Sequence, residues 1–276
     1  MYPTIEMSHL PGAIPSYTAL LLLAVLTCVT LGPGWARALE GLEPRATRRA
    51  LATLSLAALA GGRLHLVANY WGYYAAHPAA ILKLWAGLHA GGAIVAVAVA
   101  APLVVRRDGV PVGKFADAIV PIAGIGIALA RVGCFLHGCC FGTPCALPWC
   151  LAFPRGSESY QLQVDLGLIA PGTEHALPVH PLQLYFAAGG VLITLVGLWL
   201  QARKRYDGQV AIVALVLFSA SAAWLEVFRA DVPQRVYWGA LPELEWVALA
   251  MTGASLVALA VAEGTHRRVP VAAAAA

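Results

Sequence analysis

One stretch of the chain gathers the residue types that could bind an anion or a metal ion. It begins at Arg131, at the end of an apolar run, and continues through a loop rich in Gly, Pro, Cys and aromatic residues as far as Pro154. All of the six cysteines except Cys28 lie between Cys134 and Cys150. Arginine suits an anion because its guanidinium stays charged and binds phosphate in a bidentate fork.

The cysteines of this loop allow three interpretations. They could bind zinc, which prefers thiolate and imidazole ligands, although the spacing lacks the usual C-x2-C pairs. They could form disulfides if the loop is external, and Cys145 with Cys150 is a plausible pair. They could also be small buried apolar side chains. The zinc alternative would draw on His137, Cys139, Cys140, Cys145 and Cys150.

Other charged and polar residues stand inside or beside apolar runs. A charge near a bilayer core costs at least ~2.5 kcal/mol, so it usually faces the interior of a helix bundle and has a partner. The candidates are Arg63, Arg131, Glu226 and Arg229. They form either structural ion pairs, such as Glu226 with a neighbouring arginine, or an anion site that would suit a phospholipid head group.

Two histidine motifs are less specific. In His180-Pro-Leu-Gln-Leu-Tyr185, His180 and Gln183 could cap a helix start and Tyr185 could lie at a membrane interface. His89 precedes Gly91-Gly92. A lone buried histidine is either a hydrogen-bonded structural group or a base, because imidazole titrates near neutral pH.

The elements that must position these residues are membrane-spanning helices. Hydrophobic residues make up 60% of the 276 residues and charged residues only 12%, and the mean hydropathy is +0.74. Seven apolar runs are long enough to span a bilayer, at about 16–36, 50–70, 80–105, 115–135, 181–202, 209–228 and 244–263. We therefore predict an all-α, polytopic membrane protein: one transmembrane domain over residues 1–276 with a small external cap at 136–180.

The basic residues predict its orientation. Most of the 18 Lys and Arg lie in the connections after runs one, three and five and after run seven, which all fall on one side of a seven-span chain. The positive-inside rule makes that side cytoplasmic, with the N-terminus outside and the C-terminus inside. The net charge of +4 comes without a basic patch carrying interleaved aromatics, so no nucleic-acid partner is expected. No basic segment or cleavage site precedes the first run, so no removable signal peptide is expected.

The motifs, taken in order, resemble those of the bacterial prolipoprotein diacylglyceryl transferases. The resemblance is carried by Met1-Tyr-Pro with Pro15-Ser-Tyr17, Gly61-Gly-Arg63-Leu with Tyr73-Tyr74 and His77-Pro78, Asp117-Ala-Ile-Val-Pro121, Ala130-Arg131-Val-Gly133, Pro148-Trp149, Phe153-Pro154, His180-Pro-Leu-Gln-Leu-Tyr185 and Glu226-Val-Phe-Arg229-Ala-Asp231.

This resemblance implies a function in the bacterial inner membrane. It implies transfer of diacylglycerol from phosphatidylglycerol to the lipobox cysteine thiol of a preprolipoprotein, which forms a thioether and releases glycerol phosphate. No cofactor and no metal are expected. Arg131 and Arg229 would meet the phosphate and His89 would be the base. The other expected substrate-binding residues are Tyr17, Arg63, Gly142, His180, Gln183, Tyr185 and Glu226.

Several positions depart from the family pattern. The signature loop carries Cys134, Cys139 and Thr143 where the family has Asn, an acidic residue and Arg. Outside the loop, Ala90, Phe186 and Ala222 stand where the family has His, Glu and Arg. Two alternatives therefore accompany the transferase interpretation. One is a non-catalytic homologue that binds lipid or a partner, and the other is a membrane thiol–disulfide or metal-binding protein using the Cys139-Cys140 loop.

Overall fold

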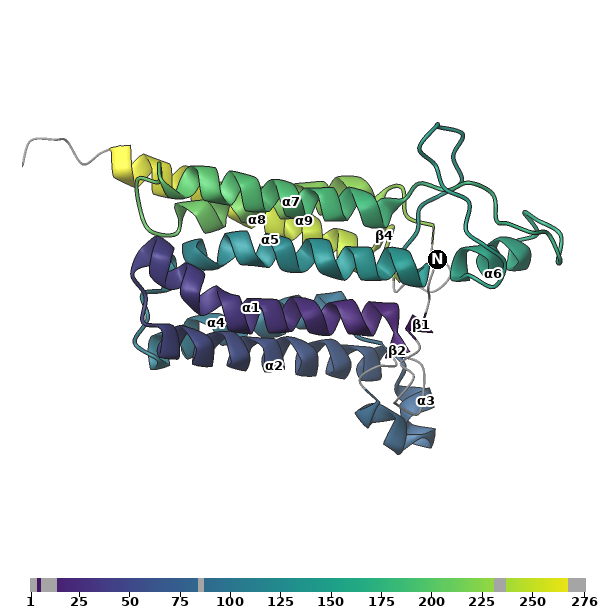
Figure 1. Ribbon diagram of the computed structural model, residues 1–276, viewed down its shortest axis with the longest axis horizontal. Coiled ribbons are helices and arrows are strands. Elements are labelled where there is room, and N and C mark those ends of the chain that lie inside the picture. Colours follow the sequence, from purple (N-terminus) through teal and green to yellow (C-terminus); the bar gives the residue numbers. More distant parts are fainter. Residues whose placement is uncertain (1–3, 6–13, 84–86, 231–236, 268–276) are drawn as a thin grey trace, which may run out of the picture.

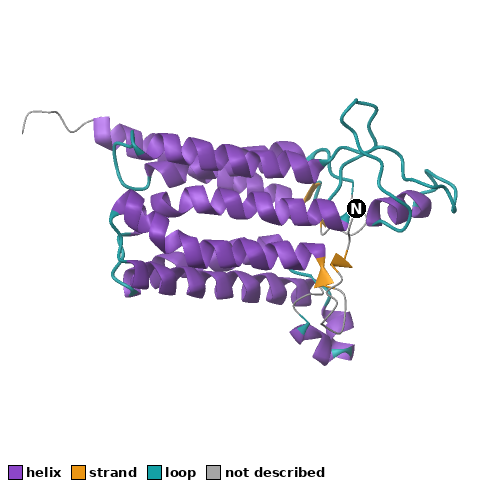
Figure 2. Ribbon diagram, in the orientation of Figure 1, coloured by secondary structure: helices purple, strands orange, loops and turns teal. Residues whose placement is uncertain are grey.

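The chain folds as a bundle of long helices, described here from a computed structural model that covers all residues except 1–3, 6–13, 84–86, 231–236 and 268–276 (Figures 1 and 2). Seven of the described helices are long and apolar enough to cross a membrane, which confirms the predicted all-α, multi-pass membrane protein. They are α1 (Ser16–Glu40), α2 (Pro44–Asn69), α4 (Ala90–Arg107), α5 (Val112–His137), α7 (Leu182–Gln201), α8 (Gln209–Glu226) and α9 (Glu243–Arg267). The motif residues Met1 to Pro3 and Asp231 lie outside the described residues.

Helix α5, which carries Arg131 near its end, is central to the bundle. It packs against α1 on one side and α7 on the other, and it also contacts α4 and α8. The remaining large contacts join α2 to α4 and α8 to α9. In Figure 1, α1, α2 and α4 therefore lie on one side of α5, and α7, α8 and α9 lie on the other. Residues near the end of α5 are thus placed between two halves of the molecule.

The short elements gather at one end of the bundle. They are the antiparallel pair β1 (Thr4–Ile5) and β2 (Ile14–Pro15), α3 (Trp71–Ala76), the 3-10 helix η1 (Pro78–Leu82), α6 (Glu158–Asp165) and the antiparallel pair β3 (Tyr237–Trp238) and β4 (Leu241–Pro242). Figure 1 shows the described C-terminal end of α9 at the opposite end of the bundle from β1 and β2. An odd number of spans requires this arrangement.

The segment between α5 and α7 packs as a cap at this end of the bundle. Its own apolar core contains Phe141, Phe153, Tyr160, Ala176 and Val179, all buried. Gln163 fixes α6 to the returning chain, because its side-chain amide accepts from the Leu177 N–H (2.7 Å) and donates to the Leu177 carbonyl (3.2 Å). The cap is therefore a packed structure and can hold its residues at fixed positions.

The third span starts later than the predicted 80–105, at Ala90. The reason is Arg63 of α2, whose guanidinium donates to the carbonyls of Ala80, Ile81 and Gly87. The His89 N–H also donates to the Gly62 carbonyl (3.0 Å). A charged group that satisfies two carbonyls of η1 and the carbonyl of Gly87 holds these residues against α2, so the chain enters α4 only afterwards.

The opposite end of the bundle is fixed by a buried carboxylate on α5. Asp117 is completely buried, and its two oxygens accept from the backbone N–H groups of Gly208 (2.8 Å) and Ala211 (3.0 Å). These are free N–H groups at the start of α8, so Asp117 caps that helix from a neighbouring one. The Lys204 ammonium, 3.0 Å away, supplies the opposite charge. Asp117 therefore joins α5 to α8.

Candidate functional site

A cavity of about 70 Å³ lies among α4, α5, α7, α8 and α9. Its wall is mostly apolar, and three charged side chains interrupt it: Arg131, Glu226 and Arg229. The apolar and small lining residues are Ala90, Ile94, Phe186, Phe218, Ser219, Ala222, Leu244, Val247, Ala248 and Met251. Two arginines in an apolar wall make the cavity a candidate anion site.

Arg131 is positioned by α5 and by an aromatic ring of α7. Its guanidinium carbon lies 4.2 Å from the centroid of the buried Phe186 ring, a cation–π arrangement. The contact places the positive charge of Arg131 over the ring and holds the side chain between α5 and α7. A planar fork held in this way is suited to a bidentate oxyanion.

Arg229 follows directly after α8 and shares the cavity with Glu226, three residues earlier. The two form an ion pair with an Nη1–Oε2 distance of 3.6 Å, and both side chains are largely buried. The other guanidinium nitrogen, Nη2, lies 3.5 Å from Sγ of Cys140. The predicted Glu226–arginine pair is therefore confirmed, and it lies in the same cavity as Arg131.

Gly142 joins the cap to the chain around Arg229. Its N–H donates to the His180 carbonyl (2.9 Å), and the next N–H, of Thr143, donates to the Phe228 carbonyl (2.7 Å). A Cβ on Gly142 would lie 2.6 Å from Cβ of His180 and 3.0 Å from the Phe228 carbonyl oxygen. Glycine is needed because three backbone segments meet here. Gly142 therefore positions the segment before Arg229, and it is not among the residues that line the cavity.

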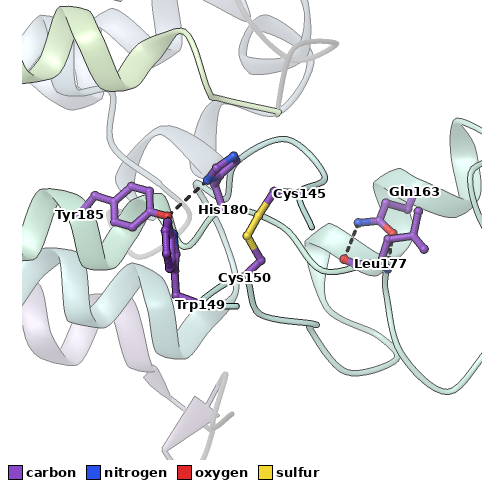
Figure 3. The surroundings of a disulfide bond; sticks show 7 residues. All are labelled: Cys145, Trp149, Cys150, Gln163, Leu177, His180 and Tyr185. Atoms are coloured by element: carbon purple, nitrogen blue, oxygen red, sulfur yellow. Dashed lines mark hydrogen bonds between the residues drawn. A yellow bond between two sulfur atoms is a disulfide. The ribbon is translucent and has the colours of Figure 1, made fainter. Parts of the chain in front are cut away.

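The predicted His180 and Tyr185 form a second polar group beside the cap, drawn in Figure 3. The Tyr185 hydroxyl accepts from the Trp149 indole N–H (2.8 Å) and lies 3.3 Å from Nδ1 of His180. The disulfide between Cys145 and Cys150 lies next to His180 in the same view. These contacts fasten the cap to the start of α7, and neither His180 nor Tyr185 lines the cavity.

Gln183, in the first turn of α7, holds the loop that follows α5. The side chain is completely buried, and its amide nitrogen donates to the Cys139 carbonyl (2.6 Å). Its amide oxygen has no hydrogen-bond partner among the described residues. Gln183 thus fixes the loop just after α5 and retains one acceptor.

His89 belongs to a cluster that sequence patterns did not reveal. Its ring stacks on His65 of α2 (centroids 4.3 Å apart), and Nε2 of His65 lies 3.0 Å from Oε1 of the buried Glu243 at the start of α9. Nδ1 of His89 is buried and has no hydrogen-bond partner in the described part of the chain. His89 itself does not line the cavity, but the next residue, Ala90, does. Only the charge of Glu243 and the histidines within apolar runs could have indicated this cluster from sequence.

Two further predicted residues have other surroundings. Arg63 donates to three backbone carbonyls and its guanidinium carbon lies 5.1 Å from the Tyr74 ring centroid. It is not among the residues that line the cavity. Tyr17, at the start of α1, passes close to α5, because a Cβ on Gly133 would lie 3.3 Å from the Tyr17 Cα. It is therefore near the loop that follows Arg131, although it is not a lining residue of the cavity.

The cysteines separate into two groups. Cys145 and Cys150 form a disulfide, in agreement with the second of the three interpretations. This pairing removes both cysteines from the zinc alternative. Cys134, Cys139 and Cys140 are free thiols whose sulfur atoms all lie within 4.8 Å of one another. The remaining cysteine, Cys28, is in α1, with its sulfur 3.8 Å from the Ile122 carbonyl oxygen.

Comparison with known proteins identifies the family of the chain. The family model of the prolipoprotein diacylglyceryl transferases matches residues 5–261. The chain is 33% identical over 259 residues to the phosphatidylglycerol--prolipoprotein diacylglyceryl transferase of an Azoarcus species, which covers 90% of this chain and 91% of the relative. It is 29% identical over 269 residues to the protein of that name from Synechococcus elongatus, with 94% and 87% covered. The chain belongs to the prolipoprotein diacylglyceryl transferase family.

Proposed function

We propose that this protein transfers the diacylglyceryl group of phosphatidylglycerol to the lipobox cysteine thiol of a preprolipoprotein. In the reaction, a bond forms between the thiol sulfur and the glyceryl carbon, and the bond from that carbon to a phosphate oxygen breaks. The thiol proton passes to a base, and glycerol phosphate leaves with the electron pair. The nucleophile belongs to the substrate, so no cysteine of the enzyme is required.

The observation that carries the proposal is the convergence of Arg131 and Arg229 on one cavity with an apolar wall. Negative charge grows on the leaving phosphate as the carbon–oxygen bond breaks. Two guanidinium groups held in place before the reaction would stabilise that charge more than they stabilise the bound lipid, which is the condition for catalysis. Glu226 offsets part of the positive charge and holds Arg229 in position.

The base in this proposal is His89. Partial burial, and then the charge of the neighbouring His65, lower the pKa of its imidazole, while Glu243 raises it. A lowered pKa keeps His89 neutral and able to accept the thiol proton at neutral pH. Glu243 and His65 would act as positioning residues, since Nε2 of His65 lies 3.0 Å from Oε1 of Glu243 and the His65 ring stacks on His89.

The cavity of about 70 Å³ is much smaller than a whole phospholipid molecule. It therefore suits the phosphate region, and the acyl chains would extend into the surrounding bilayer.

We further propose that the protein lies in the bacterial inner membrane with the cap outside and the described end of α9 inside. The basic residues Arg106 and Arg107 at the end of α4, and Arg203 to Arg205 after α7, support this orientation.

Complementation of a strain depleted of its own transferase tests the proposal. We expect the wild type to restore growth and lipid modification of a reporter lipoprotein, and Arg131→Ala to fail at equal abundance in the membrane. Arg48→Ala, which removes an exposed arginine near the start of α2, is the matched control and should behave as wild type. Failure of a correctly inserted wild type would contradict the proposal.

A second candidate is favoured by one specific observation. Ala90, Phe186 and Ala222, which stand where the family has His, Glu and Arg, all line the cavity. A site with fewer polar groups could bind phosphatidylglycerol without reacting. Measurement of phosphatidylglycerol retained by the purified protein, together with the complementation result, separates a lipid-binding homologue from an active transferase.

A further inference from the structure

The three free thiols at the end of α5 form a cluster that the proposed transfer reaction does not use. Cys134 is buried, and Cys139 and Cys140 are partly buried. Their Sγ atoms lie within 4.8 Å of one another. A lone buried cysteine is commonly a small apolar side chain, but three sulfur atoms meeting at one point constitute a potential ligand set.

The local backbone brings the sulfur atoms together. Gly138 ends α5 in the left-handed conformation (φ 85°), and both its N–H and that of Cys139 donate to the Cys134 carbonyl (2.9 and 3.2 Å). In such a helix-ending turn, the second residue after the helix folds back over the last turn. In this chain the second residue after α5 is Cys139, and it folds back over Cys134 in the last turn. Cys140 then takes a positive φ of 59°, unusual for a residue with a side chain.

The loop is also held from outside the turn. Gln183 donates to the Cys139 carbonyl (2.6 Å), and the Gly142 N–H donates to the His180 carbonyl (2.9 Å). The cluster is therefore fixed by α7 and by the cap as well as by its own turn. Preorganised ligands lose little conformational entropy when they bind an ion.

We propose that Cys134, Cys139 and Cys140 form a three-thiolate binding site for a soft, thiophilic metal ion such as copper(I). Metal–thiolate bonds are about 2.3 Å long, so three sulfur atoms around one ion are roughly 4 Å apart. The separations within 4.8 Å require only small side-chain rotations. Thiolate-only ligation selects soft ions over magnesium or calcium.

The surrounding charges suit this occupant. Three thiolates with one monovalent ion carry a net negative charge, and Nη2 of Arg229 already lies 3.5 Å from Cys140 Sγ. A disulfide would engage two of the sulfur atoms and leave the third beside it, whereas one metal ion engages all three. The site is separate from the disulfide of Cys145 and Cys150, which is closed already.

The test uses the full chain in lipid nanodiscs under anaerobic conditions. Copper(I) is titrated against a chromogenic chelator. We expect one ion per chain and a loss of affinity of more than about tenfold in each of Cys134→Ser, Cys139→Ser and Cys140→Ser. Cys28→Ser removes the free thiol that lies outside the cluster, and it should leave the affinity unchanged. Wild-type affinity in any one of the three cluster variants would overturn the proposal.

A measurement on the wild type covers the case in which a variant fails to fold. Copper(I) should protect the three cluster thiols, but not Cys28, from alkylation, as mapped by mass spectrometry. Equal protection of Cys28, or a disulfide within the cluster in protein alkylated directly in its native membranes, would also overturn the proposal. Both measurements are made without lipid donor or lipoprotein, so their outcome does not depend on transferase activity.

Discussion

The Arg131 guanidinium lies 4.2 Å from the centroid of the Phe186 ring, in the wall of the cavity that Arg229 also lines. Helix α5 supplies the arginine and α7 supplies the ring. This contact limits where the guanidinium group can lie in the cavity wall. Arginine binds a phosphate through two N–H groups of its planar guanidinium. We therefore expect the transfer rate to depend on this bidentate geometry and not on positive charge alone.

Replacement of Arg131 tests that expectation. Arg131→Ala should lower the transfer rate on the order of 10²–10³-fold, as loss of one preorganised oxyanion donor does in other enzymes. Arg131→Lys should recover only part of the loss, because an ammonium cannot make the bidentate contact. Rates measured with a lipobox peptide and phosphatidylglycerol vesicles decide this, and full activity of the lysine variant would show that charge alone suffices.

Gly142→Ala should disrupt the junction between the cap and Arg229. The added methyl group would lie 2.6 Å from Cβ of His180, and overpacking of this kind costs about 1–3 kcal/mol. We expect a lower melting temperature and reduced transfer. Gly189→Ala is the matched control, since a Cβ at Gly189 meets nothing within 4 Å. Equal behaviour of the two variants would refute the role given to Gly142.

Asp117→Asn should destabilise the bundle without touching the cavity. It removes the charge from a fully buried carboxylate that faces Lys204 and caps α8. Lys204 keeps Glu40 as a partner (2.6 Å), so we expect the loss of charged hydrogen bonds to cost about 1.5–3 kcal/mol. Asp207→Asn removes the exposed partner of the same lysine and should cost at most about 1 kcal/mol. Denaturant unfolding of both variants in the same detergent provides the comparison.

Glu243→Gln should change the pH dependence of transfer. Glu243 raises the pKa of His89, against the effects of burial and of His65. Its neutralisation therefore lowers that pKa further, and the acidic limb of the pH–rate profile should move to lower pH, since His89 must be neutral to accept a proton. Glu245→Gln on the same helix is the control. An acidic limb that stays in place would argue against His89 as the base.

Much of the fold could be predicted from the sequence because a membrane span is a local property. About 20 consecutive apolar residues identify a helix without knowledge of its neighbours, and all seven helices were located in this way. The apolar pattern places the start of the third span near residue 80, but the helix begins at Ala90. The difference arises because Arg63 of α2 holds the carbonyls of Ala80, Ile81 and Gly87. That contact lies between segments and leaves no local pattern.

The charged residues of the candidate site were also identifiable from sequence. Arg131, Glu226 and Arg229 are noticeable because charge is rare in apolar runs, and the two arginines and the glutamate do line one cavity. The sequence could not distinguish these residues from Arg63, because Arg63 also lies within an apolar run. The difference is one of partners: Arg63 is satisfied by backbone carbonyls, whereas Arg131 rests on an aromatic ring.

The sequence by itself therefore determined the helices, their number and the charges that must face inward, since these follow from residue type along a continuous stretch. Only the tertiary structure decided which distant side chains meet. It brought His65 of α2 and His89, just before α4, against Glu243 of α9. It also divided the cysteines into the closed pair Cys145–Cys150 and the open cluster. The physical reason is that such meetings depend on how helices and loops pack, which spacing along the chain does not encode.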